Sequence, residues 1–197
     1  AYTGMIAPDD AMPSVADRYD VIVSAGGGAV GEDLLRASLA ARERTSLSSA
    51  RWLIVTGPNL PDEAVSRLQA KASDTVEIVR FRPDLALLLR QAMVSVSQAG
   101  YNTVADVLRA QCASVLVPFA AHGEQEQTIR ASRLAAAGLA VCVQPGDLSP
   151  ENLARAIDAA CMQQDRDHSA GMLLDGAVAT ADILRERYKT FRCGRSA

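Results

Sequence analysis

The sequence predicts an α/β fold, a Rossmann-like doubly wound parallel sheet of about six strands. Two observations support this fold class. Six short apolar runs recur along the chain, and each is continuous and rich in β-branched residues, as strands covered on both faces are. Helical patterns separate these runs, and such alternation is typical of parallel sheets with right-handed crossovers. The length of 197 residues has room for one such domain, or at most two small ones.

The elements can be placed in order along the chain. The expected strands lie at residues 21–23, 52–55, 76–79, 93–96, 114–117 and 139–143, of which the last is the weakest. The helical patterns between and after them lie at residues 31–44, 61–72, 84–91, 102–111, 124–137 and 150–163. Pro61 and Pro150 fall in first helical turns, where the missing N–H costs nothing, and Gly138 lies where a C-cap is needed.

The two ends of the chain differ from this core. Residues 1–19 are irregular and rich in turn formers, and we expect an interdomain linker there. Residues 20–165 form the expected Rossmann-like domain. Residues 166–197 contain one long helical pattern, at 169–188, and a tail, and we interpret this segment as a crossover helix that would brace a second domain. The arrangement suggests one half of a two-domain protein.

Composition excludes several classes of protein. The formal net charge of −3 argues against a nucleic-acid partner, because a duplex-DNA binder needs a basic face. The aromatic content of 4% also disfavours surfaces that stack bases. The sequence has no uninterrupted run of about 18 apolar residues and no signal-peptide pattern, so we expect a soluble, cytoplasmic chain.

No metal site is expected. The four cysteines are far apart, and we interpret them as buried or idle thiols of a reducing compartment: Cys112, Cys142, Cys161 and Cys193. Asp165 and Asp167 spell the DxD pattern of metal-dependent transferases, but they follow a helix in a polar connector.

In an open parallel sheet, ligands bind beyond the carboxyl ends of the strands, near the point where the strand order reverses. After the first expected strand, Gly26, Gly28 and Gly31 satisfy a GxGxxG pattern, with Gly27 between the first two. Glycines allow close approach to a diphosphate, and the helix N-terminus behind them favours negative charge. A tight strand–helix turn explains the same glycines. A dinucleotide site would also need an acid at the end of the second strand, where the chain instead has Thr56 and Gly57.

Two further turns carry polar groups. The turn after the fourth strand contains Ser97 and Gly100 and opens a helix, which suits a second anion site. Asp106, in that helix, could accept hydrogen bonds from a ribose diol, or could simply stabilise the helix N-terminus. The turn after the fifth strand carries acids and amides at 124–127, which suit sugar hydroxyls and equally a solvated first helical turn.

These turns together carry a family resemblance. Segments 97–106, 117–119, 126–127 and 130–131 resemble the donor-binding signature of MurG-like family 28 GT-B glycosyltransferases. The resemblance is to the C-terminal domain of that family and covers residues 20 to about 165. It implies a UDP-sugar donor, a Rossmann-like half of a GT-B enzyme and transfer of a hexosyl group to an acceptor that the sequence does not identify.

The resemblance also implies roles for individual residues. The diphosphate would lie near Gly26, Gly27, Gly28, Ser97 and Gly100, and Asp106 would bind the ribose. Phe81 and Arg82 would lie beside the base, largely through their backbone, although Arg82, like Arg80, could equally pair with acids or line the cleft. The sugar would contact Glu126, Gln127 and His122, of which His122 could also be a plain loop residue.

The chain departs from the family in two ways. Glu126 stands where the family has glutamine, so the sugar, whether a hexose or an N-acetylhexosamine, stays open. The acceptor domain, with its catalytic base, is not in this sequence, so we expect the chain alone to be inactive and to self-associate through its exposed cleft surface. No cofactor is expected, and the full-length enzyme could be peripheral to the inner membrane. The alternatives are half of a UDP-sugar 2-epimerase and a non-catalytic nucleotide- or dinucleotide-binding module.

Overall fold

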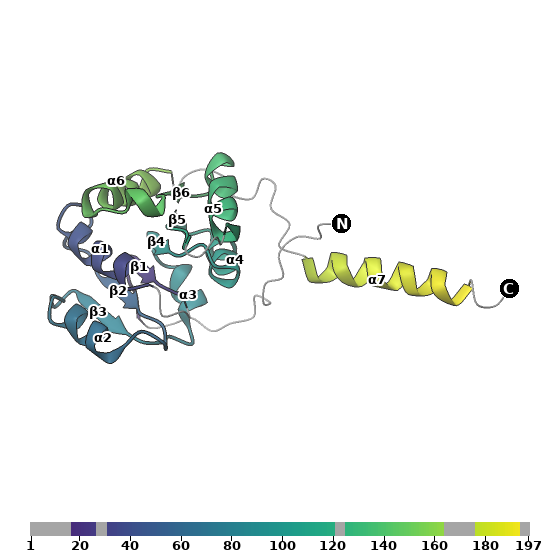
Figure 1. The fold of residues 1–197 in the computed structure, drawn as a ribbon, viewed down its shortest axis with the longest axis horizontal. Coiled ribbons are helices and arrows are strands. Elements are labelled where there is room, and N and C mark those ends of the chain that lie inside the picture. The colour runs from purple at the N-terminus through teal and green to yellow at the C-terminus, as the bar shows by residue number, and fades with distance from the viewer. Residues whose placement is uncertain (1–16, 27–30, 121–124, 164–175, 194–197) are drawn as a thin grey trace. The chain divides into compact units, whose positions relative to one another are not determined.

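The computed structural model describes residues 17–26, 31–120, 125–163 and 176–193. Within these ranges six strands form one parallel sheet in the order β3-β2-β1-β4-β5-β6 (Figure 1). The strands are β1 (Val21–Ser24), β2 (Trp52–Val55), β3 (Val76–Val79), β4 (Val94–Ser97), β5 (Ala113–Leu116) and β6 (Val141–Cys142). The predicted fold class is therefore confirmed. The sixth strand is shorter than expected, because only two of its residues pair with β5 at the sheet edge.

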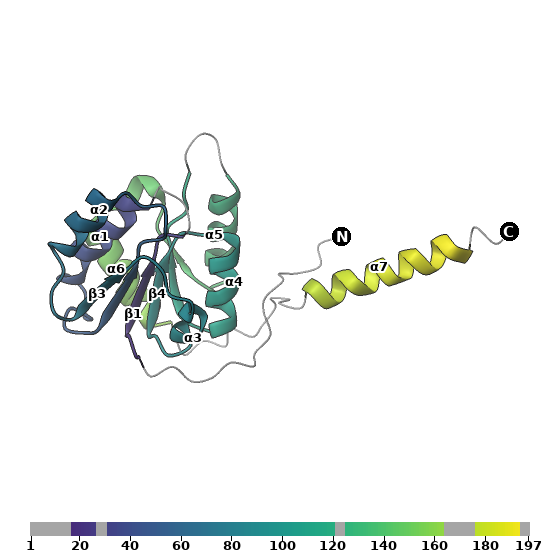
Figure 2. The same ribbon diagram turned by 90° about the horizontal axis from the view of Figure 1, so that it is seen from below.

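Helices cover both faces of the sheet (Figure 1, Figure 2). On one face lie α1 (Glu32–Arg42), α2 (Asp62–Gln69) and α6 (Pro150–Cys161). On the other lie α3 (Leu85–Leu89), α4 (Tyr101–Ala110) and α5 (Glu126–Ala136). A 3-10 turn at Pro145–Asp147 precedes α6, where the hydroxyl of Ser149 caps the helix by accepting from the N–H of Asn152 at 3.1 Å.

The last helix, α7 (Gly176–Cys193), belongs to a separate compact unit. It ends five residues beyond the predicted limit of 188, because no helix breaker occurs before Gly194. The first part of the predicted helix, up to residue 175, lies outside the described residues. None of the helices in the described ranges is long and apolar enough to cross a membrane.

The core explains why these segments form strands. All residues of β1, β2, β4 and β5 are buried, because helices cover both faces of these strands, whereas the edge strand β3 exposes Glu77. Trp52 is fully buried, and its indole N–H donates to the carbonyl of Leu47 at 2.9 Å. Tyr19, which the sequence places in the lead-in, is only 2% exposed and packs with the α3 side of the core.

The strand order places the candidate turns together. It reverses between β1 and β4, where Ser24 is paired in register with Ser97. The N–H of Gln98 donates to the carbonyl of Ser24 at 3.3 Å, and the N–H of Val117 donates to the carbonyl of Ser97 at 2.9 Å. The segments that follow β1, β4 and β5 therefore begin at one edge of the sheet, at the switch point where ligands of such folds bind.

Candidate functional site

The β1–α1 turn needs its glycines for two different reasons. Gly26 has φ +72°, in the left-handed region that favours glycine. Gly31 has an ordinary φ, but a Cβ there would lie 2.2 Å from the Cβ of Ala25. Gly31 therefore allows α1 to pack closely on the chain that leaves β1. Gly27 and Gly28 lie outside the described residues, and phosphate contact by this turn stays a prediction.

In the β4–α4 turn, the described residues leave room for a side chain at Gly100. Gly100 is the N-cap of α4 with an ordinary φ of −63°, and a Cβ there would meet only Thr103 Oγ1, at 3.9 Å. Neither backbone conformation nor packing within the described residues therefore requires glycine here. Among the described residues no side chain caps α4, and its first turn carries no acid. A helix N-terminus of this kind is suited to an anion.

Ser97 lies at the base of this turn. It is fully buried, and within the described residues its hydroxyl has no hydrogen-bond partner. A buried hydroxyl without a partner is costly, so it indicates a group that the described chain does not supply. The turn also lies beside the glycine turn, because a Cβ on Gly26 would be 3.5 Å from Oε1 of Gln98. The structure thus brings Gly26 and the Ser97–Gly100 turn together.

Asp106 lies in the second turn of α4 and is half-buried. Burial raises the pKa of its carboxyl group, and the charge of Arg109 lowers it by a smaller amount. Among the described residues no hydrogen bond reaches this carboxylate. The dipole of α4 does not explain its position, since the dipole's effect falls off within the first turn. A carboxylate that burial destabilises is suited to accept hydrogen bonds from a ligand.

Glu126 and Gln127 begin α5, and both have partners within the chain. The Oε1 atom of Gln127 accepts from the N–H of Phe119 at 3.1 Å, so its amide group remains as the donor. Glu126, whose side chain is 72% exposed, forms an ion pair with Arg130 one turn later. His122 lies outside the described residues. The two residues expected at the sugar are therefore adjacent at the start of α5, and their contact with a sugar stays a prediction.

Arg80 and Arg82 both pair with acids, as one of the two interpretations of the sequence expected. Arg82 forms a bidentate pair with Asp84, with both distances at 2.8 Å, and also contacts Asp17 at 3.0 Å. These carboxylates raise the pKa of the guanidinium. Arg80 donates to the carbonyl of Leu60 at 2.8 Å and pairs with Asp62.

The ion pairs of Arg82 limit how Phe81 and Arg82 could contact the base of a nucleotide. Because its guanidinium is held by acids, contact with a base would use the backbone, as expected. Phe81, beside it, is 68% exposed and offers an aromatic face.

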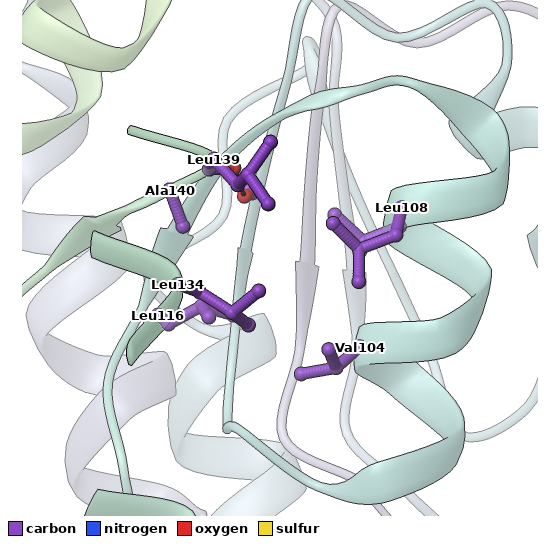
Figure 3. Close-up of a pocket in the computed structure, with 8 residues that line it drawn as sticks. Val104, Leu108, Leu116, Leu134, Leu139 and Ala140 are labelled. Atoms are coloured by element: carbon purple, nitrogen blue, oxygen red, sulfur yellow. Dashed lines mark hydrogen bonds between the residues drawn. The ribbon is translucent and has the colours of Figure 1, made fainter. Parts of the chain in front are cut away.

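Three other features of the described residues do not add to the candidate site. The pocket shown in Figure 3 lies among residues of α4, β5 and α5, is lined almost wholly by apolar side chains and leaves no space that a water molecule could enter. No group of three metal-ligating side chains occurs in the described ranges, and Asp165 and Asp167 lie outside them. Burial raises the pKa of the Cys112 thiol to about 12, which disfavours the reactive thiolate form.

Sequence reasoning did not assign a role to Arg130, which contacts both the β4–α4 turn and Glu126. Its i,i+4 spacing from Glu126 was a signal for an ion pair. Nothing in the sequence indicated its contact with Ala99, 31 residues away.

The fold is that of one half of a GT-B glycosyltransferase. The chain is similar to the crystal structure of Acinetobacter baumannii MurG, with a TM-score of 0.69 and 21% identity over 87% of this chain and 51% of that one. It is also similar to the calicheamicin glycosyltransferase CalG4, with a TM-score of 0.61 and 18% identity over 92% of this chain and 45% of that one. Os79 from O. sativa, solved in complex with UDP, has a TM-score of 0.58 and 20% identity over 84% of this chain and 36% of its own.

Residues 21–173 match the glycosyltransferase family 28 C-terminal domain, and the chain belongs to this family. It is 31% identical over 173 residues to the UDP-N-acetylglucosamine--N-acetylmuramyl-(pentapeptide) pyrophosphoryl-undecaprenol N-acetylglucosamine transferase of Exiguobacterium sp., covering 86% of this chain and 48% of that protein. The protein of the same name from Agrobacterium fabrum is 26% identical, over 73% of this chain and 39% of its own length. The chain thus spans about half the length, or less, of the curated relatives it matches, and the predicted MurG-like resemblance is confirmed.

Proposed function

We propose that the chain is the donor-binding half of a hexosyltransferase and that it binds a UDP-hexose or UDP-N-acetylhexosamine at the β1–β4 switch point. The observation that carries this proposal is the arrangement of Ser97 and Gly100 at the start of α4. There the buried hydroxyl of Ser97 has no partner among the described residues, and a Cβ on the N-cap residue Gly100 would meet no described atom within 4 Å except Thr103 Oγ1. The family membership and the names of the relatives support a nucleotide-sugar donor.

The donor would extend along the carboxyl edge of the sheet. Its diphosphate would lie at Ser97, Gly100 and the glycine turn of residues 26–28, where backbone N–H groups and helix dipoles favour negative charge. The ribose hydroxyls would donate to Asp106. The base would lie beside the backbone of Phe81 and Arg82, and the sugar would contact Glu126, Gln127 and His122.

The proposed reaction breaks the bond between the sugar's anomeric carbon and the β-phosphate oxygen and forms a bond from that carbon to an acceptor oxygen. The acceptor hydroxyl loses its proton to a base that we expect in the other half of the enzyme, which would also hold the acceptor. Charge develops on the departing UDP, and the N-terminus of α4 and nearby backbone amides would stabilise it. A metal ion is not needed for this step.

Calorimetry with UDP, UDP-N-acetylglucosamine and NAD tests the proposal. We expect UDP and the UDP-sugar to bind and to raise the melting temperature, and NAD to do neither. Gly100→Ala should weaken UDP binding, because its Cβ would enter the space that the diphosphate needs. Gly146→Ala, whose Cβ would have no atom within 4 Å, is the control and should bind UDP normally. Binding of NAD in preference to UDP would instead favour a dinucleotide-binding module.

A further inference from the structure

The side chain of Arg130 joins two turns that are far apart in the sequence. Its Nη1 atom donates to the carbonyl of Ala99 at 2.6 Å, and its Nη2 atom pairs with the carboxylate of Glu126. The guanidinium also lies 5.7 Å from the ring centroid of Tyr101, the first residue of α4. The side chain of Arg130 is only 17% exposed, whereas that of Glu126 is 72% exposed, so water screens the contact with Ala99 less than the ion pair with Glu126.

These contacts are specific to arginine. A guanidinium is planar and presents several donors in a fixed fork, so it can bind a carbonyl oxygen and a carboxylate at the same time. Ala99 immediately precedes the N-cap Gly100, and Glu126 is the first residue of α5. Arg130 therefore holds the start of α4 and the start of α5 in one arrangement.

We propose that Arg130 is a positioning residue that fixes the β4–α4 turn at Ala99 and Gly100 and the start of α5 at Glu126 as one unit of the donor site. This inference rests on the proposed function. By holding the carbonyl of Ala99, Arg130 would set the orientation of the first N–H groups of α4 toward the diphosphate. By pairing with Glu126, it would hold that carboxylate toward the sugar and neutralise a negative charge that would otherwise repel the diphosphate.

The test compares the affinities of UDP and UDP-N-acetylglucosamine in matched variants. Arg130→Met should weaken UDP binding by about tenfold, a loss typical of a charged hydrogen bond, and should reduce the preference for the UDP-sugar over UDP. Arg130→Lys keeps the charge but can hold only one of the two partners, so it should also lose the sugar preference. The control is Arg133→Met, which removes the same charge from an exposed position one turn along α5 and should change neither affinity.

A double-mutant cycle separates positioning from a general effect on stability. Glu126→Gln alone should reduce the preference for UDP-N-acetylglucosamine over UDP. Adding Arg130→Met should reduce this preference little further, because both substitutions remove the same ion pair between Arg130 and Glu126. The proposal would be overturned if Arg130→Lys kept the wild-type affinities for UDP and UDP-N-acetylglucosamine. It would also be overturned if the losses of the two single variants added up in the double variant, or if Arg130→Met and Arg133→Met had equal effects on these affinities. If the wild-type chain binds neither UDP nor the UDP-sugar, the proposed function itself fails, and this inference fails with it.

Discussion

We expect Asp106 to have opposite effects on the stability of the folded chain and on its affinity for UDP. Burial in α4 raises the pKa of its carboxyl group, which means that folding destabilises the charged form. A ligand that donates hydrogen bonds to the carboxylate would offset that cost. The same residue should therefore weaken the free protein at neutral pH and strengthen its complex with UDP.

Asp106→Asn should raise the melting temperature at neutral pH while weakening UDP binding by about 10- to 100-fold, as expected for a charged hydrogen-bond acceptor. The gain in stability has a defined pH dependence. Because the folded pKa lies above the ordinary value of 3.8, the wild type loses stability as the pH rises from that value through the folded pKa. The difference between variant and wild type should be largest above the folded pKa and should vanish below 3.8. Thermal melts across this range and calorimetry at neutral pH measure the two effects.

The control for this prediction is Asp74→Asn, an exposed carboxylate that precedes β3 at the amino edge of the sheet, opposite to the donor site. It removes one negative charge at a residue outside the donor site, so UDP affinity should not change appreciably. If Asp106→Asn left UDP affinity unchanged, Asp106 would have no place in the ribose site.

The side-chain oxygen and the side-chain NH2 group of Gln127 have different roles. Its Oε1 atom shapes the β5–α5 segment by accepting from Phe119, and its amide group is the donor left for a sugar. Gln127→Ala should reduce the affinity advantage of UDP-N-acetylglucosamine over UDP and leave UDP binding nearly unchanged. Gln127→Glu keeps an acceptor for Phe119 but loses the donor, so calorimetry should find the same reduction. A glutamate variant with the full sugar preference would show that Gln127 acts only by shaping the loop.

At the scale of elements, the close approach of α1 to the end of β1 depends on Gly31. A Cβ there would lie 2.2 Å from the Cβ of Ala25 and within 3.3 Å of its carbonyl oxygen, and neither of these atoms can rotate away. We expect Gly31→Ala to destabilise the domain by about 1–3 kcal/mol, the usual cost of overpacking, as measured by chemical denaturation. Gly146→Ala is the matched control, and an equal stability of the two variants would contradict the packing role of Gly31.

At the scale of the whole molecule, transfer needs an acceptor held within hydrogen-bond reach of a base. The polar groups at the carboxyl edge described above are all assigned to the donor. The chain also covers only 48% of the Exiguobacterium relative. We therefore expect these 197 residues to bind a UDP-sugar without transferring the sugar to any acceptor.

A coupled assay for UDP release measures this prediction. Activity should appear when the segment that corresponds to the N-terminal half of the relatives is supplied, either fused to the chain or in trans. Sugar transfer by the 197 residues alone, above spontaneous hydrolysis, would place the catalytic base within this chain.

The sequence by itself determined the strands and the edge of the sheet at which the candidate residues lie. Continuous apolar runs identify buried strands, and the first five runs lie within one residue of the observed strands β1 to β5. Because parallel strands end at a common edge, position after a run was enough to select Gly26, Ser97, Gly100 and Asp106 as candidates. These signals are local, since each depends on residues that are neighbours in the chain.

The tertiary structure alone decided what the long polar side chains do. Arg82 could equally have lined a cleft, but Asp17, 65 residues away, helps to hold it among acids. Arg130 reaches Ala99 across 31 residues, and Gly31 is needed because of the approach of Ala25. The physical reason is that a flexible charged side chain takes its direction from whichever partner the packed fold brings within hydrogen-bond distance. Local spacing in the sequence can indicate a near partner such as Glu126 for Arg130, but it does not encode a distant one such as Ala99.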